Sequence, residues 1–165
     1  MGKAACSLVK EPMHRLKRTV KLPITVEEAW NFFSNPKNLQ KITPENMGFN
    51  ITSEFFKDNM YAGQIITYKV SPLLGIKMNW MTEITQVKEG EFFIDEQRVG
   101  PYKIWHHQHH FKAIEGGVEM TDIIDYVVPF GFLGRLVEPI IVRGKLKEIF
   151  DYREQKMDKL FGMIH

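Results

Sequence analysis

Hydrophobic and polar positions alternate along most of the chain between residues 49 and 128. A period of two is typical of β-strands that bury one face and expose the other. Gly and Pro interrupt the alternation at intervals, and such short links favour antiparallel pairing of neighbouring strands. The pattern therefore predicts six strands, over residues 49–55, 64–70, 76–87, 91–99, 102–114 and 118–128.

The chain before and after these strands has different signals. Residues 13–22 alternate as a first strand. Thr25 and Glu28 have the spacing of a capping box, in which each side chain binds a free amide at the start of a helix. Asn35-Pro36 predicts the start of a second short helix, since Asn is a good N-cap and Pro suits the first helical position. After residue 129 the apolar spacing becomes helical to the end of the chain.

The predicted order is a strand, two short helices, six strands and one long helix. We expect an α+β fold, in which a curved antiparallel sheet of six or seven strands grips the C-terminal helix. Two short helices would lie between strands 1 and 2. Residues 1–12 are expected to form a flexible N-terminus, and residues 13–165 a single domain.

Composition narrows the function classes. The formal charge is +2 over 165 residues and the Lys and Arg residues are scattered, which argues against nucleic acid as a partner. The single cysteine, Cys6, excludes an intramolecular disulfide and is compatible with a reducing compartment. No apolar run reaches the 18 or more residues of a membrane span. We expect a cytoplasmic protein, whose oligomeric state the sequence leaves open.

The segment 105–111 carries the most information, because it places four imidazoles on one predicted strand. Strand geometry divides the side chains between two faces. One face holds Trp105, His107, His109 and Phe111, and the other holds His106, Gln108, His110 and Lys112. The first set is aromatic at both ends and polar in the middle, which suits the wall of a mainly apolar pocket.

Strand pairing predicts which residues share that face. A two-residue loop at Gly116-Gly117 would pair Phe111 with Asp122, His109 with Ile124 and His107 with Tyr126. Cross-strand partners point to the same side, so Asp122 and Tyr126 would join the imidazoles on the concave face. Pairing with the Trp80 strand would place Phe93, Asp95 and Gln97 there too, and we select Gln97. The solvent face would hold His106, Gln108, His110, Glu119, Thr121 and Asp125.

Three interpretations of this face stay open. The imidazoles could satisfy Asp122, Tyr126 and backbone groups in a structural network. They could instead orient a small molecule in a pocket. They could also perform chemistry, either as acid–base groups (His107 or His109 with Asp122) or as metal ligands with Asp122 or Tyr126 as the third donor. Without cysteines or a carboxylate cluster the metal signal is weak, and we predict no metal and no cofactor.

The chain resembles the START-like helix-grip (SRPBCC, polyketide cyclase-like) superfamily, and more closely its bacterial ligand-binding branch. The resemblance extends from about Leu16 to Phe161. It rests on Asn35-Pro36, Ile42-Thr43-Pro44, Gly63, Ile66 to Tyr68, Asp95-Glu96-Gln97, Gly100-Pro101-Tyr102, Trp105, His107, His109, Phe111, Asp122, Tyr126, Pro129, Phe150, Tyr152 and Arg153. It implies a deep cavity between the sheet and the last helix, with catalysis in only some branches. It also implies an epimerase-like protein partner.

Together these arguments predict binding of a hydrophobic or aromatic small molecule, which would be lipid-, quinone- or polyketide-like, in that cavity. The expected ligand-binding residues are Trp80, Gln97, Trp105, His107, His109, Phe111, Asp122, Tyr126, Leu146, Phe150 and Arg153. One alternative is a metal-free cyclase- or dehydratase-like enzyme that uses His107 or His109 with Asp122. Another is a regulatory module that binds a protein. The balance of the sequence is against an enzyme.

Overall fold

The computed structural model describes residues 12–54, 59–71, 76–129 and 141–164. Its strands form one antiparallel, seven-stranded sheet in the order β1-β7-β6-β5-β4-β3-β2, so the first two strands lie at opposite edges. The strands are β1 (His14–Leu22), β2 (Asn50–Ile51), β3 (Ile65–Val70), β4 (Met78–Lys88), β5 (Phe92–Val99), β6 (Ile104–Ile114) and β7 (Gly117–Val127).

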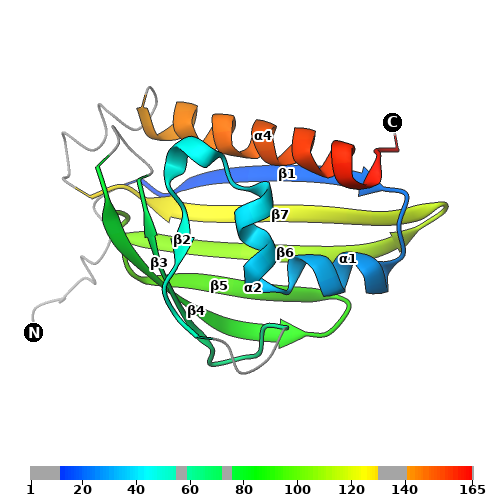
Figure 1. Cartoon of the computed structure of the whole chain (residues 1–165), viewed down its shortest axis with the longest axis horizontal. Helices are drawn as coiled ribbons and strands as arrows, with labels where there is room; N and C mark the ends of the chain where they lie inside the picture. The colour runs from blue at the N-terminus through cyan, green and yellow to red at the C-terminus, as the bar shows by residue number, and fades with distance from the viewer. Residues whose placement is uncertain (1–11, 55–58, 72–75, 130–140, 165) are drawn as a thin grey trace, which may run out of the picture.

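The helices gather on one side of this sheet. Between β1 and β2 come α1 (Val26–Phe33), α2 (Pro36–Leu39) and the 3₁₀ turns η1 (Gln40–Ile42) and η2 (Glu45–Met47), and after β7 comes α4 (Arg143–Phe161). Figure 1 shows α4 running along the β1 edge, while α1 and α2 lie in front of the central strands. The predicted fold class is confirmed.

The predicted helix starts are also confirmed. The Thr25 hydroxyl accepts from the Glu28 amide at 3.1 Å, and the Glu28 carboxylate accepts from the Thr25 amide at 2.8 Å. Asn35 accepts from the Lys37 amide at 3.0 Å, with Pro36 at the first helical position. The capping box fixes the start of α1. The apolar face of this helix, which includes Trp30, is turned toward the sheet.

The strand predicted over residues 49–55 is much shorter in the structure. Strand β2 has only two residues and pairs with β3 alone. Beyond it, the Thr52 and Ser53 amides both donate to the carbonyl oxygen of Thr67, at 2.8 and 3.3 Å. Two successive amides on one acceptor break the ladder, which needs alternate residues to bond in turn. Position 55 of the predicted strand lies outside the described residues.

The predicted pairing of β6 with β7 is wrong by two residues. The loop is Glu115-Gly116, so Phe111 pairs with Met120, His109 with Asp122 and His107 with Ile124. A tight hairpin needs a positive φ, and Gly116 provides it at +78°. Moving the loop by one position moves the pairing by two, which is the period of a strand, so the predicted faces remain correct.

The core lies between the concave face of the sheet and the helices. Leu22, Val118 and Ile124 are completely buried, and Trp30 packs edge-on against Phe111 with ring centroids 5.6 Å apart. On the opposite face, Asp125 differs from the expected solvent position, since only 8% of it is exposed. Both of its carboxylate oxygens accept from the Arg15 guanidinium, at 2.6 and 2.7 Å, and this pair shields it.

Two glycines allow the hairpin geometry to be tested. A Cβ added at Gly116 or at Gly144, in the first turn of α4, would meet no atom within 4 Å. We expect Gly116→Ala to lower the free energy of unfolding by about 1–2 kcal/mol, because alanine is strained at positive φ. The control Gly144→Ala should raise it by roughly 0.5–1 kcal/mol. Urea denaturation measures both, and equal effects would contradict the assigned turn.

Candidate functional site

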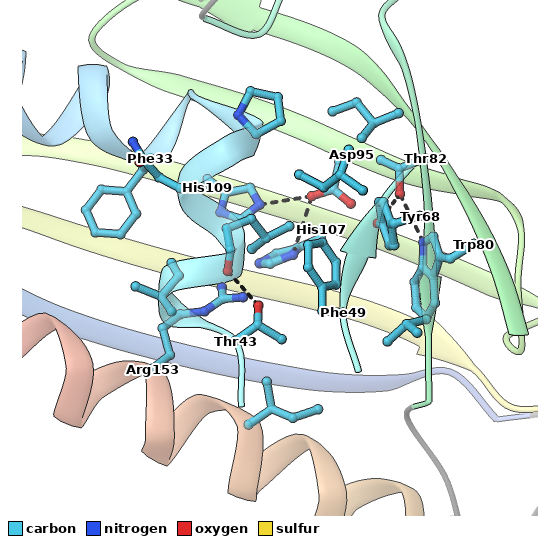
Figure 2. Close-up of a pocket in the computed structure, with 18 of the residues that line it drawn as sticks. Phe33, Thr43, Phe49, Tyr68, Trp80, Thr82, Asp95, His107, His109 and Arg153 are labelled. Atoms are coloured by element: carbon cyan, nitrogen blue, oxygen red, sulfur yellow. Dashed lines mark hydrogen bonds and ion pairs between the residues drawn. The ribbon is translucent and has the colours of Figure 1, made fainter. Parts of the chain in front are cut away.

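A cavity opens between the concave face of the sheet and the helices α2 and α4. Its volume, counted as the space open to the centre of a water molecule, is about 150 Å³. That is on the order of ten times what one water molecule needs. Apolar side chains make up most of its wall, among them Leu39, Ile66, Trp80, Trp105, Leu146 and Phe150. Figure 2 shows part of this wall.

The wall formed by β3 and β4 is aromatic, and its polar atoms are already satisfied. Trp80 donates its indole N–H to the hydroxyl of Thr82 at 3.0 Å, and the Tyr68 hydroxyl lies 2.7 Å from the same oxygen. Burial raises the pKa of the Tyr68 hydroxyl far above its usual value, with the charge of Asp95 acting in the same direction. Tyr68 is therefore a neutral phenol that presents its ring to the cavity.

Four ionisable side chains from three adjacent strands meet beside this aromatic wall. We call Asp95 (β5), His107 and His109 (β6) and Asp122 (β7) the His–Asp quartet. Asp122 Oδ1 lies 3.0 Å from His107 Nε2 and 2.8 Å from His109 Nδ1. Asp95 Oδ2 lies 2.9 Å from His109 Nε2 and 3.5 Å from His107 Nδ1 (Figure 2). Each imidazole thus lies between two carboxylates.

The quartet has more N···O contacts than two neutral imidazoles can bond. A neutral imidazole has a single N–H, whereas an ionised carboxylate only accepts, so four N···O contacts cannot all be bonded. Burial alone would lower the pKa of His109, but its hydrogen bonds with Asp122 and Asp95 outweigh burial and raise it. Burial and the charge of His109 lower the pKa of His107. Of the two imidazoles, His109 is therefore the one that holds an additional proton more readily.

The carboxylates of the quartet stay ionised. Burial would raise the pKa of Asp122, but the hydrogen bonds with both imidazoles overcome that effect and hold the pKa well below its usual value. The pKa of Asp95 is lowered in the same way, against burial, by the imidazoles and by the more distant charge of Arg153. With His109 protonated the quartet has a net charge of −1, and the charge of Arg153 on α4 acts on Asp95 without a direct contact.

The structure divides the predicted ligand-binding residues into two groups. One group lines the cavity: Trp80, Trp105, His107, His109, Leu146, Phe150 and Arg153. The other group does not: Gln97, Phe111, Asp122 and Tyr126. A direct role of any of them in binding stays a prediction.

The residues of the second group support the wall from behind or from the side. Gln97 faces the predicted side, but its amide binds the backbone N–H and C=O of Tyr102 in the turn after β5. Asp122 lies behind the two imidazoles, and Phe111 packs in the core. Tyr126 stacks on His14, with ring centroids 5.4 Å apart.

Several lining residues are not predicted from the sequence. Asp95 falls on the predicted face, but alternation alone gives no reason to choose it over Gln97. Ile66 and Tyr68 come from β3, and Leu39 comes from α2. Apart from the resemblance, which includes Ile66 to Tyr68, their only sequence signal is the amphipathic pattern that every core residue shares.

Asp95, His107 and His109 also form the one set of described residues that could hold a metal ion. Their donor atoms lie within 4.8 Å of one another. The third donor is thus Asp95, and not Asp122 or Tyr126 as the sequence suggests. Asp122 would stand behind the two imidazoles, where it would orient them. All three donors, however, already face partners within the quartet.

Among the described residues, no helix is both long enough and apolar enough to cross a lipid bilayer.

Solved structures with a similar fold include protein Ms6760 from Mycobacterium smegmatis (18% identity, TM-score 0.63, 88% of this chain and 89% of that one). Protein CV1439 from Chromobacterium violaceum is 14% identical, with a TM-score of 0.65, and the match covers 93% of this chain and 99% of that one. Ginseng major latex-like protein 151 from Panax ginseng is also 14% identical, with a TM-score of 0.63, and the match covers 90% of this chain and 97% of that one. No family model matches the chain, and no curated protein matches it in sequence. At these identities the likeness shows a shared helix-grip fold.

The charge of His109 can be tested through the pH dependence of stability. Its folded-state pKa is raised above the unfolded value near 6.5, so its protonation stabilises the fold fully below about pH 6.5. That stabilisation is lost as the pH rises through the raised pKa. We expect His109→Gln to lower the free energy of unfolding by about 3–5 kcal/mol at pH 6 and by less at pH 9, measured by urea denaturation.

The matched control is His106→Gln, which removes an imidazole from the opposite face of the same strand. His106 is 31% exposed and lies 3.0 Å from Glu96. Its replacement should cost no more than about 1 kcal/mol at either pH. A His109→Gln effect of the same size at both pH values would contradict the loss of the His109 proton between pH 6 and pH 9.

Proposed function

We propose that this protein binds a hydrophobic or aromatic small molecule, lipid-, quinone- or polyketide-like, in the cavity between the sheet and α4. The observation that carries this proposal is the cavity itself: about 150 Å³ of space, enclosed mainly by apolar side chains, with a charged group of residues on one wall. Ligand sites in proteins combine these features, a concave apolar surface and a few polar groups that orient the ligand.

The size of the cavity argues against a packing defect. Protein interiors are close-packed, and voids larger than one water molecule are few in a domain. An apolar void of this size leaves its lining without van der Waals partners on one side. An apolar molecule that fills it regains these contacts and removes its own surface from water.

The distribution of polar groups suggests how the ligand lies. Trp80, Trp105 and Tyr68 present ring surfaces, and the indole rings of Trp80 and Trp105 meet edge to face, with centroids 5.4 Å apart. Asp95, His107, His109 and Arg153 line another part of the cavity. A molecule with an apolar or aromatic body and one polar end would match both parts.

The geometry supports binding over catalysis. A general base must reach the proton that it removes. All four ring nitrogens of His107 and His109 lie within 2.8–3.5 Å of a carboxylate oxygen of the quartet. Each ring nitrogen therefore faces a carboxylate, although only the two Nε2 atoms have the geometry of hydrogen bonds.

We also infer that the chain belongs to the bacterial ligand-binding branch of the START-like superfamily. The helix-grip fold and the residues that carry the resemblance support this. An epimerase-like partner follows from the resemblance alone. A cytoplasmic location rests on the single cysteine and the absence of a long apolar run. Both stay predictions.

Filling the cavity tests the proposed function. Ile66 on β3 lines the cavity and is 4% exposed, whereas its neighbour Ile65 is 44% exposed. We expect wild-type protein purified from its source to retain a small molecule in native mass spectrometry. Ile66→Trp should abolish this retention, because the indole occupies the ligand's volume. Ile65→Trp makes the same change outside the cavity and should retain the molecule.

A thermal-shift screen of a lipophilic library gives an independent readout, and Ile66→Phe serves if the larger side chain prevents folding. Wild-type protein should show ligand-induced shifts that the Ile66 variant loses. Empty spectra together with no shift for any library member would reject the proposal.

A further inference from the structure

Arg153 places a positive charge on the apolar side of α4. The buried residues of this helix are Leu146, Phe150, Arg153 and Met157, at the three- and four-residue spacing of one helical face. Arg153 is 7% exposed and lines the cavity. Its guanidinium lies over the Phe150 ring, 4.9 Å from the centroid, and Figure 2 shows it pointing from α4 into the cavity.

This guanidinium has no anionic partner in the part of the chain that the structure describes. Its Nε is buried and makes no hydrogen bond, and no described carboxylate lies within ion-pair distance of it. The more exposed Arg15, Arg18 and Arg98 each pair with an acidic side chain. Burying an unpaired charge is costly, and the Phe150 ring compensates only a part of that cost.

The quartet does not supply the missing partner. Asp95 is the acid whose charge acts on Arg153 across the cavity, yet its Oδ2 already faces His109 at 2.9 Å and His107 at 3.5 Å. Asp122 is covered by the same two imidazoles. The charge that lacks a contact at the cavity wall is thus positive.

We propose that the bound molecule is an amphipathic carboxylic acid whose carboxylate pairs with Arg153, while its apolar body lies against Trp80 and Trp105. This inference rests on the proposed function. The planar guanidinium matches a carboxylate with two parallel N–H···O bonds. One guanidinium without a direct anionic contact suits a monoanion better than a phosphate dianion. A neutral analogue would leave the guanidinium desolvated and unpaired, and the site would discriminate against it.

Matched amphiphiles test this assignment on the wild-type protein. The probes are decanoate, decan-1-ol, decylamine and decyl phosphate, with 2-naphthoate and 2-naphthol as an aromatic pair. Trp80 and Trp105 line the cavity, so quenching of tryptophan fluorescence reports binding, and calorimetry confirms it. We expect each carboxylate to bind about 10- to 100-fold more tightly than its alcohol, the range of a charge-assisted hydrogen bond.

Variants then show whether Arg153 is the discriminating group. Arg153→Gln should bring the acid and the alcohol to within about twofold of each other, and Arg153→Lys should keep part of the preference. Lys159→Gln removes an equal charge from an exposed position on the same helix and should keep all of it. A merely structural role of Arg153 would change both affinities together and would leave their ratio intact.

The outcomes separate this inference from the proposed function. Equal binding of acid and alcohol by the wild type, or an unchanged ratio in Arg153→Gln, overturns the carboxylate assignment but leaves the cavity as a binding site. Tightest binding of decylamine would make Asp95 the recognition group, and tightest binding of decyl phosphate would require a dianion site. Both results reject the assignment. If no probe binds and no lipophilic compound shifts the unfolding temperature, the proposed function itself fails.

Discussion

The structure depends on the mutual compensation of two carboxylates and two imidazoles inside an apolar layer. Each of these groups would be strongly disfavoured there alone, because burial penalises its charged form and leaves its hydrogen bonds unmade. Together they form four N···O contacts of 2.8–3.5 Å. Asp95, the histidines and Asp122 come from three adjacent strands. The same contacts therefore hold β5, β6 and β7 in one register and form one wall of the cavity.

Strand faces could be predicted from the sequence, whereas strand pairing could not. Alternation from Trp105 to Phe111 is a local property of the backbone, so it survives any pairing that shifts by an even number of residues. The hairpin loop at Glu115-Gly116 depends on which of two adjacent glycines takes the positive φ. Both choices keep the faces, and nothing local distinguishes them. Three members of the quartet, His107, His109 and Asp122, could therefore be predicted from alternation. The contact of His109 with both acids could not.

The cavity and its other wall depend on packing between distant segments. The resemblance implies a cavity, but its lining by Leu39, Ile66 and Tyr68 follows from how α2 and β3 pack, which periodicity does not encode. Arg153 shows the opposite case, since the sequence places it at the cavity and only the structure shows its lack of a partner. The end of regular strand pairing after β2 could not be predicted from the sequence either, because it depends on the Thr52 and Ser53 amides sharing one acceptor.

The His–Asp quartet makes the two sides of the cavity mechanically different. On the sheet side, the four members of the quartet contact one another, so reshaping that wall would break several contacts at once. On the helical side, α2 is a single turn and α4 is joined to the sheet mainly through side chains. The cavity would therefore adapt to ligands of different length mainly by displacement of the helices. The strands would impose the strictest limits on the shape of the ligand.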